Sequence, residues 1–253
     1  MSARRIFCRF CGASGAHRFG KDRQRRQRYQ CPHCLKVFTL RTRTAKSGSQ
    51  LSDEQWRMAL RLFSLRAGMS GTDLSDVLHV HRRTGQKLNR ILRRLTAGLR
   101  PRTLPGVSEW DESMFSKQWV LGGVSRRSRQ CLLQIVPNRT EETLVPLVEI
   151  HSDPEGLIFT DEWGGYINLQ RHMTVCHARE FVNPQATFVH TNTQEGVWGH
   201  AKALSWHTYR GIPRSSLPQF LCEIMFRYNI RSYQTRFSVL SALLSRKTNS
   251  LLS

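Results

Sequence analysis

Apolar residues return at helical intervals between residues 53 and 99, which predicts three helices. The first begins after Ser52, a suitable N-cap, and carries Trp56 and Phe63 on one face. The second is short, and the third runs over about 82–99 with basic residues on its outer side. Three helices with a tight turn and a basic last helix are typical of a helix-turn-helix. The alternative is a solvated helical hairpin that serves as a spacer.

Beyond residue 106 the pattern changes to that of β-strands. Strands are predicted for residues 107–112, 118–124, 131–136 and 156–161, and a short one for 186–189. Asn138 or Thr140 can cap a helix after the third strand, and Thr193 can cap another that contains Glu195. With a further helix before the last strand, this order is the layout of an RNase H-like α/β domain. Residues 217–244 are predicted to form one core helix that ends beside the active site.

Charge adds an expected partner. The 253-residue chain has 39 Lys and Arg against 18 Asp and Glu, a net charge of +21. Such a field attracts polyanions, and nucleic acid is the first candidate, with an anionic membrane surface as the competing one. We find no run of about 18 apolar residues and no signal-peptide pattern, so no membrane partner is expected. We expect a cytoplasmic, nucleoid-associated protein.

The cysteines predict a structural zinc site. Cys8, Cys11, Cys31 and Cys34 form two Cys-x-x-Cys pairs separated by nineteen residues, the spacing of a tetrahedral Zn²⁺ site. Disulfides are the alternative, but an intracellular compartment disfavours them. The segment between the pairs indicates a β-hairpin with a basic turn, as in a zinc ribbon. So short a segment buries little core, so the metal must supply its folding energy.

The remaining cysteines and the basic residues have simpler interpretations. Three cysteines without partner spacing, Cys131, Cys176 and Cys222, are read as ordinary buried residues. Contacts to DNA are expected from the ribbon's turn and from the outer side of the third helix. The candidates for these contacts are Arg25, Arg26, Arg82, Arg83, Lys87 and Arg90, and Arg93 and Arg94 are placed on the same outer side.

Three carboxylates are placed where they can converge. Asp111 and Asp161 lie at or near strand ends, where open α/β sheets gather ligands, and Glu195 opens the helix after a later strand. Hard oxygen ligands suit Mg²⁺ or Mn²⁺, and two such ions can activate an attacking oxygen and steady a leaving one. Taken singly, each aspartate is as well explained as a turn residue or cap. The neighbouring Glu112 and Glu162 should point to the opposite side of their strands.

The helix of Glu195 carries a second candidate. Lys202 lies seven positions further on, so both side chains project from one face, where the ammonium can hold a phosphate oxygen. The plainer interpretation is an exposed acid and an exposed base. His190 either orients a carboxylate or is a structural histidine. Trp198 and Trp206 are interpreted as packing residues rather than base-stacking wedges.

At this point the chain resembles a known family. Its motifs are Trp110-Asp111-Glu112-Ser113, Thr160-Asp161 with Tyr166, His190-Thr191-Asn192-Thr193-x-Glu195-Gly196 with Lys202, and Phe226-Arg227-Tyr228-Asn229. With the four-cysteine ribbon, they resemble the DDE transposases of small bacterial insertion sequences. The similar branch is the zinc-ribbon-bearing, ISXO-two-like one related to eukaryotic Merlin elements. Pro184 departs from the pattern, where a histidine is expected.

The resemblance implies a catalytic domain in which Asp111, Asp161 and Glu195 hold two Mg²⁺ or Mn²⁺ ions and Lys202 contacts DNA. Some members use asparagine as third ligand, which makes Asn192 a secondary candidate. Expected partners are double-stranded DNA, as terminal inverted repeats and target, and further copies of the chain in a synaptic complex. The expected domains are a zinc ribbon at 1–45, a helix-turn-helix at 46–103 and the RNase H-like domain at 104–253. The alternatives are a domesticated, inactive DNA-binding protein and a metal-dependent nuclease.

Overall fold

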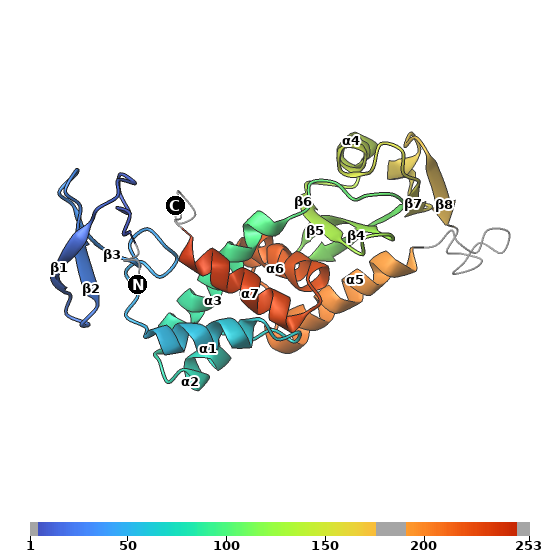
Figure 1. Cartoon of the computed structure of the whole chain (residues 1–253). Coiled ribbons are helices and arrows are strands. Elements are labelled where there is room, and N and C mark those ends of the chain that lie inside the picture. The colour runs from blue at the N-terminus through green and yellow to red at the C-terminus, as the bar shows by residue number, and fades with distance from the viewer. Residues whose placement is uncertain (1–4, 176–190, 247–253) are drawn as a thin grey trace. The chain divides into compact units, whose positions relative to one another are not determined.

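The computed structural model describes residues 5–175 and 191–246 (Figure 1). The chain divides into two compact units, one formed by Met1–Arg61 with Phe237–Ser253 and the other by Leu62–Arg236. Four features singled out in the sequence lie outside the described residues: His190, Cys176, Pro184 and the predicted strand at 186–189. Every helix within the described ranges is too short or too polar to cross a lipid bilayer.

The first unit contains a three-stranded antiparallel sheet in the order β1-β2-β3. Its strands are β1 (His17–Lys21), β2 (Gln27–Gln30) and β3 (Val37–Thr39). The buried core beside it consists of Cys8, Cys31 and Phe38, which is too little apolar surface to hold a fold by burial alone. The predicted hairpin is therefore confirmed, with a third strand added.

Helix α1 (Asp53–Phe63) begins as the sequence predicts. The Ser52 hydroxyl accepts a hydrogen bond from the Gln55 backbone N–H at 3.0 Å, and the Ser52 N–H donates to the Gln55 side chain at 2.9 Å. This reciprocal pair is a capping box, which satisfies two backbone donors that a helix start leaves free.

In the second unit, α2 (Gly71–Val77) and α3 (Arg82–Thr96) cross in close contact. A Cβ at Gly85 would lie 2.2 Å from the carbonyl oxygen of Gly71, so only glycine permits this approach. The turn between them contains His79 in the left-handed region, with φ of 50°. The structure thus has two helices joined by a tight turn, and the helix-turn-helix motif with its role in DNA binding remains a prediction. Helix α3 continues into a short 3-10 turn, η1 (Ala97–Leu99).

The prediction that Arg93 lies on the exposed basic side of α3 is wrong. Its side chain is buried and its guanidinium pairs with Glu223 at 2.7 Å. Glu223 is itself fully buried and also pairs with Arg227 at 2.6 Å. Its carboxylate accepts a hydrogen bond from the Tyr209 hydroxyl, also at 2.6 Å. Arg93 also stacks on the Tyr209 ring, 4.2 Å from its centroid. The buried carboxylate offers Arg93 a better partner than water does, so it holds α3 against α6 (Leu217–Asn229).

Glu223→Gln should lower the free energy of unfolding by roughly 3–5 kcal/mol near neutral pH, because it leaves Arg93 and Arg227 without their buried counter-charge. Burial acts to raise the pKa of Glu223, but the charges of Arg227 and Arg93 outweigh it and hold this pKa below its usual range. The stability it contributes is therefore complete above about pH 4.3 and is lost as the pH falls through its folded-state pKa.

Urea unfolding near pH 7 and near pH 3 measures this difference, which should shrink in acid. Glu149→Gln is the matched control, because Glu149 is exposed on a helix of the same unit. Its expected change is within about 0.5 kcal/mol. An unaltered midpoint for Glu223→Gln at neutral pH would contradict the assigned pairing.

The second unit is built on a five-stranded mixed sheet in the order β6-β5-β4-β7-β8. The strands are β4 (Ser108–Phe115), β5 (Gln118–Ser125), β6 (Cys131–Val136), β7 (Ile158–Asp161) and β8 (His172–Val175). The first three are antiparallel, and β4, β7 and β8 are parallel. A mixed α/β domain is confirmed. Between β7 and β8 lies the 3-10 turn η2 (Gly164–Tyr166), and β8 was not predicted. Residues 162–175 contain no part of the helix predicted before the last strand, and the rest of its range lies outside the described residues.

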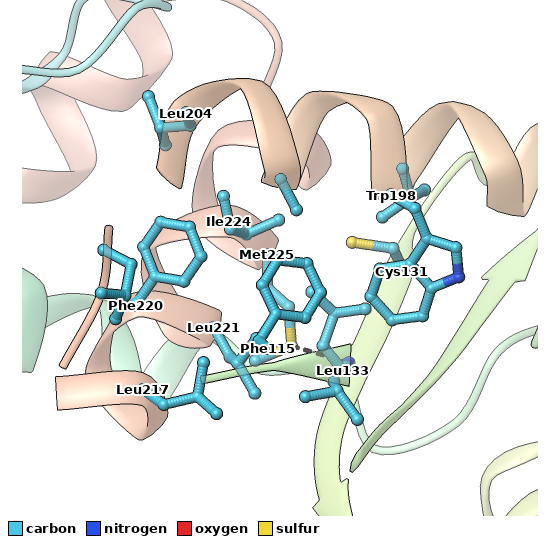
Figure 2. Close-up of a cluster of buried hydrophobic side chains, with 14 of the residues drawn as sticks. Phe115, Cys131, Leu133, Trp198, Leu204, Leu217, Phe220, Leu221, Ile224 and Met225 are labelled. Carbon is cyan, nitrogen blue, oxygen red and sulfur yellow. Dashed lines mark hydrogen bonds between the residues drawn. The ribbon is translucent and has the colours of Figure 1, made fainter. Parts of the chain in front are cut away.

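Helices cover both faces of this sheet (Figure 1). Helix α4 (Glu141–His151) covers one face over a core that includes Trp110, Leu144 and Tyr166. On the other face, α5 (Asn192–Ala203) and α6 enclose a core that includes Trp198 and Phe220 (Figure 2). Alternating side chains of β4 therefore enter two different cores, which fixes the register of this central strand.

The prediction of one helix over 217–244 is wrong. Helix α6 ends at Asn229, Ile230 is extended with φ of −117° and ψ of 93°, and α7 (Tyr233–Ser245) follows. The Asn229 side chain explains the end: it accepts the Cys131 N–H at 2.7 Å and donates to the Cys131 carbonyl at 3.0 Å. This pair of bonds joins the last turn of α6 to the start of β6. In this structure Arg227 and Asn229 are bonded within the scaffold rather than to the carboxylates discussed below.

Candidate active site

Strand register brings two of the predicted carboxylates together. In the parallel pair of β4 and β7, Ser108 is opposite Ile158 and Glu109 is opposite Phe159. The paired residues end there, but the same spacing continued by two residues sets Asp111 level with Asp161, and the charge of Asp161 does act on Asp111. Both aspartates therefore belong to one edge of the sheet, at the carboxyl end of β7.

The environment of Asp111 opposes its ionisation. Burial, and then the negative charge of Asp161, raise the pKa of Asp111 to about 6, and Glu195 contributes in the same direction. The N–H of Glu112 donates to one carboxylate oxygen at 2.7 Å and the Trp198 indole N–H donates to the other at 2.9 Å. These bonds lower the pKa of Asp111, but by less than the burial and the repulsion raise it. Three carboxylates that repel one another in a partly buried place are the setting in which a cation is stabilising.

Asp161 lies on the same edge and is half-buried. Its carboxylate accepts the Trp163 backbone N–H at 3.1 Å, a bond that fixes the turn after β7. The neighbouring Glu162 is exposed. Asp161 is thus held by the backbone, and among residues 5–175 and 191–246 its second carboxylate oxygen accepts no hydrogen bond.

Glu109 is a functional residue that the sequence analysis missed. It is fully buried, and one carboxylate oxygen accepts the backbone N–H groups of Thr193 at 2.8 Å and Gln194 at 3.0 Å. The other oxygen pairs with Arg126 at 2.6 Å. The N-cap position is Thr191, which makes no side-chain capping bond, so the predicted cap by Thr193 is wrong. The Glu109 carboxylate from β4 caps the helix instead, and its negative charge interacts favourably with the positive end of the α5 dipole.

This cap positions the first turn of α5 beside Asp111. Strand alternation predicts it, since Glu109 and Asp111 lie two positions apart and face the same side of the sheet. Glu195, three residues inside α5, is exposed, and so are Asn192 and Lys202. Glu195 and Lys202 lie seven positions apart on this helix, as the sequence predicts. Solvent can therefore reach both side chains.

Glu112 lies on the opposite face of β4, toward α4 and Tyr166. Burial raises the pKa of Glu112 to about 7, the Tyr166 hydroxyl acts in the other direction, and Asp161 and Asp111 add repulsion. One Glu112 carboxylate oxygen is buried and without a hydrogen bond. The alternation that separates Asp111 from Glu112 is thus seen in the structure.

The four cysteines form a compact metal-binding group. Their sulfur atoms all lie within 4.8 Å of one another, and the Cys8–Cys34 and Cys11–Cys31 separations are 3.6 Å. A disulfide needs about 2.05 Å, whereas tetrahedral Zn–S bonds of about 2.3 Å place sulfurs about 3.8 Å apart. Backbone N–H groups of Phe10 and Cys34 point to the Cys8 and Cys31 sulfurs at 3.3 Å and 3.5 Å. The donor set fits one structural Zn²⁺.

Asp111, Asp161 and Glu195 are less tightly gathered. Over residues 5–175 and 191–246, the cysteines are the one group of His, Cys, Asp or Glu side chains close enough to hold a metal together. The charge of Glu195 raises the pKa of Asp111, yet in the described residues the exposed Glu195 carboxylate is not within metal-sharing distance of both aspartates. Their oxygen chemistry nevertheless fits Mg²⁺ or Mn²⁺.

The predicted DNA-contacting residues differ in their freedom. Arg25 is exposed at the ribbon turn, but Arg26 is half-buried and pairs with Asp22 at 2.7 Å, so it already stabilises the turn. The four predicted residues of α3, Arg82, Arg83, Lys87 and Arg90, are all exposed. Trp206 is 73% exposed in a π-helical turn, η3 (Leu204–Thr208), so its interpretation as a packing residue is wrong. Trp198 does pack in the core.

Trp198→Phe should lower the rate of the predicted strand-joining reaction at Asp111 by about tenfold, because one charge-assisted hydrogen bond of about 1.5 kcal/mol is lost. The phenyl ring still fills the core against Phe115, whose ring centroid lies 5.8 Å from that of Trp198. The measurement is the initial rate of DNA strand joining, with circular dichroism to check the fold. Trp206→Phe is the control and should keep the rate. Equal rates for all three proteins would contradict a positioning role.

Gly122→Ala should destabilise the second unit by about 1–3 kcal/mol through overpacking. Gly122 is opposite Asp111 in the sheet, and a Cβ there would lie 2.3 Å from the Gln194 side chain and 2.6 Å from the Trp198 ring. Gly199→Ala is the matched control: a Cβ there meets nothing within 4 Å, and it should stabilise α5 by up to about 1 kcal/mol. Urea unfolding separates the two signs. A stable Gly122→Ala protein would contradict this packing.

Known proteins resemble parts of this chain. Residues 108–229 match the family described as ISXO2-like transposase domain. An uncharacterised transposase-like protein of Haemophilus influenzae is 26% identical over 113 residues, which is 43% of this chain and 89% of that protein.

Two solved structures share part of the arrangement at 12% identity. The catalytic core domain of BIV integrase has a TM-score of 0.33, covering 49% of this chain and 84% of that one. The simian T-cell lymphotropic virus intasome, in complex with PP2A regulatory subunit B56 gamma, has a TM-score of 0.34, covering 62% and 68%.

Proposed function

Since residues 108–229 match the family described as ISXO2-like transposase domain, we propose that the protein is a DDE transposase that cleaves element ends and joins them to target DNA. The observation that carries this proposal is the register of β4 and β7, which sets Asp111 beside Asp161. Glu195 lies in the first turn of α5, whose start is fixed by the Glu109 cap. We further propose an RNase H-like fold for this domain, supported by its strand order and by the helices on both faces.

Asp111, Asp161 and Glu195 would hold divalent cations, with Mg²⁺ or Mn²⁺ expected. When bound, such ions polarise a phosphodiester and stabilise the charge on the attacking and leaving oxygens. The chain's own residues prepare the place. Trp198 holds the Asp111 carboxylate in one orientation, and Glu109 fixes the start of α5. Exposed Lys202 would hold a phosphate oxygen of the DNA backbone.

We assign DNA recognition to the ribbon and to α3. The four exposed basic residues of α3 and Arg25 of the ribbon would contact the terminal repeat, and Zn²⁺ on the four cysteines would hold the ribbon together. We assign the domains to 1–45, 46–103 and 104–253. Strand joining at two element ends requires two active sites, so the working form is proposed to be a homo-oligomer.

A strand-transfer assay tests the function. Purified protein, Mn²⁺, a labelled duplex ending in the element's terminal repeat and a target plasmid are combined beside the Glu195→Gln variant. Joined product from the wild type alone is the expected result. Cleavage without joining would instead support a nuclease, and tight repeat binding without any cleavage would support an inactive DNA-binding protein. An Asn192→Ala arm tests the secondary ligand.

A further inference from the structure

An arginine-lined pocket borders α5 within the second unit. Its volume is about 270 Å³. The lining comes from α5, from the end of α6 and the residues after it, from α7 and from the segment between α1 and α2. The residues that the argument uses are Arg66, Gly196, His200, Arg227, Arg231 and Arg236. We call these six residues the arginine pocket.

The charge of the arginine pocket is poorly compensated. Arg227 is paired with buried Glu223, which also serves Arg93. Within the described ranges, Arg66, Arg231 and Arg236 form no ion pair. Arg236 is only 4% exposed, and its guanidinium donates to the carbonyls of Ser64, Ile230 and Arg231 at 2.7 Å each. A buried cation that has only carbonyl partners is costly, and an anion in the pocket would offset that cost.

The pKa values of titratable groups in the pocket shift in the direction that an excess of positive charge produces. Burial, and then the charges of Arg66 and Arg227, lower the pKa of His200, and Arg236 adds to this, whereas Glu223 opposes it. The pKa of Arg236 is lowered as well, by burial and by the charges of Arg227 and Arg66. These groups destabilise one another's charged forms, so a bound anion would relieve all of them.

A glycine of α5, Gly196, belongs to the lining of the arginine pocket. A Cβ at Gly196 would meet nothing within 4 Å, so no packing within the described chain requires glycine there. Glycine inside a helix weakens the helix relative to alanine, so this position favours space over helix stability. Gly196 directly follows Glu195 and lies one turn from His200 on α5. The pocket therefore borders the helix that carries the proposed catalytic carboxylate.

Resting on the proposed function, we propose that the arginine pocket binds one phosphate of the DNA backbone, in the strand that runs along α5 toward Glu195. Guanidinium groups suit this ligand because their donors match phosphate oxygens in pairs. Arg66 and Arg231 are exposed and stand at the mouth, and Arg227 and Arg236 are buried at its base. The pocket thus fixes the position of the strand, while the carboxylates act on a neighbouring phosphodiester.

The test uses the full chain and inorganic phosphate as the first probe. His200 is titrated by NMR in phosphate and in chloride at equal ionic strength. Phosphate should raise the pKa of His200 by at least about 0.5, because a dianion favours the imidazolium. The Arg66→Gln/Arg231→Gln variant should lose this rise, and both changes are at exposed positions. Arg214→Gln, at an exposed arginine outside the pocket, removes one of the two charges that the double variant removes and is the control; it should keep this rise.

The second arm measures the affinity for the element-end duplex at several salt concentrations. Loss of one phosphate contact should reduce the slope of log K against log salt by about 0.9 in the double variant and not in Arg214→Gln. No effect of phosphate on His200 would overturn the pocket, even if the wild type joins DNA ends. A phosphate effect with an unchanged slope would reduce it to an adventitious anion site and overturn the DNA contact. Both effects without any joined product would refute the transposase and leave the pocket standing.

Discussion

Asp111→Asn and Asp161→Asn should each reduce strand transfer by roughly 1,000-fold or more, while repeat binding stays within about twofold. Loss of a carboxylate that holds a catalytic metal removes several kcal/mol of transition-state stabilisation, and about 4 kcal/mol corresponds to a factor near 1,000. DNA grip is assigned to α3 and the ribbon, so it should survive. The measurements are joined product per unit time and duplex binding by fluorescence anisotropy.

Glu112→Gln is the sharpest control for this pair. It changes the adjacent carboxylate of the same strand, which faces α4 and Tyr166 rather than α5. We expect it to retain strand transfer within about tenfold, with circular dichroism confirming the fold. If Glu112→Gln were inactive and Asp111→Asn active, the assignment of the two faces of β4 would be wrong. Loss of DNA binding in both aspartate variants would contradict the division of labour.

Cys31→Ser, or removal of zinc by a chelator, should unfold the ribbon and weaken binding to the element end about tenfold or more. Structural Zn²⁺ supplies about 10–16 kcal/mol of apparent binding free energy in zinc-finger peptides, and the ribbon's own core is three buried residues. The second unit should keep its thermal transition, since its cores contain none of these cysteines. Zinc content, limited proteolysis and duplex binding follow the three effects.

Cys222→Ser serves as the control, because Cys222 packs against the core of the second unit and lies outside the ribbon. It should hold one zinc ion per chain, as the wild type does. A Cys31→Ser protein that retained one zinc and resisted protease would show that the four sulfurs are not the site. Unchanged DNA binding after full zinc loss would remove the ribbon from end recognition.

The sequence predicted the sheet well where the hydrophobic pattern was unambiguous. The β6 boundaries, Cys131–Val136, were predicted to the residue, and β5 differs by one residue at its end. These strands are central or buried, so each is a run of apolar residues whose ends are clear in the sequence. The α6–α7 break left no such signal, since no glycine or proline interrupts 217–244 after the first turn. It is caused by Asn229, whose partner in β6 lies 98 residues earlier.

Two side chains of the second unit show why local patterns fail. Thr193 is a sound N-cap by sequence, but Glu109, 84 residues away, accepts its N–H instead. Arg93 sits on a helix face that its neighbours make basic, yet a buried carboxylate on α6 recruits it. In both cases a charge from a distant element overrides a local preference. Buried Glu109 could have been noticed from its spacing, two positions before Asp111 on the same strand face.

The two-residue spacing of Glu109 and Asp111 restricts the length of β4. Glu109 and Asp111 share the face that α5 covers, whereas Trp110 packs toward α4. One residue inserted between them would send every later side chain of the strand to the opposite face and part Asp111 from α5. Related chains should therefore keep the length of β4 constant. Their insertions should gather in exposed turns such as the one at Arg127 and Ser128, where an extra residue moves no ligand.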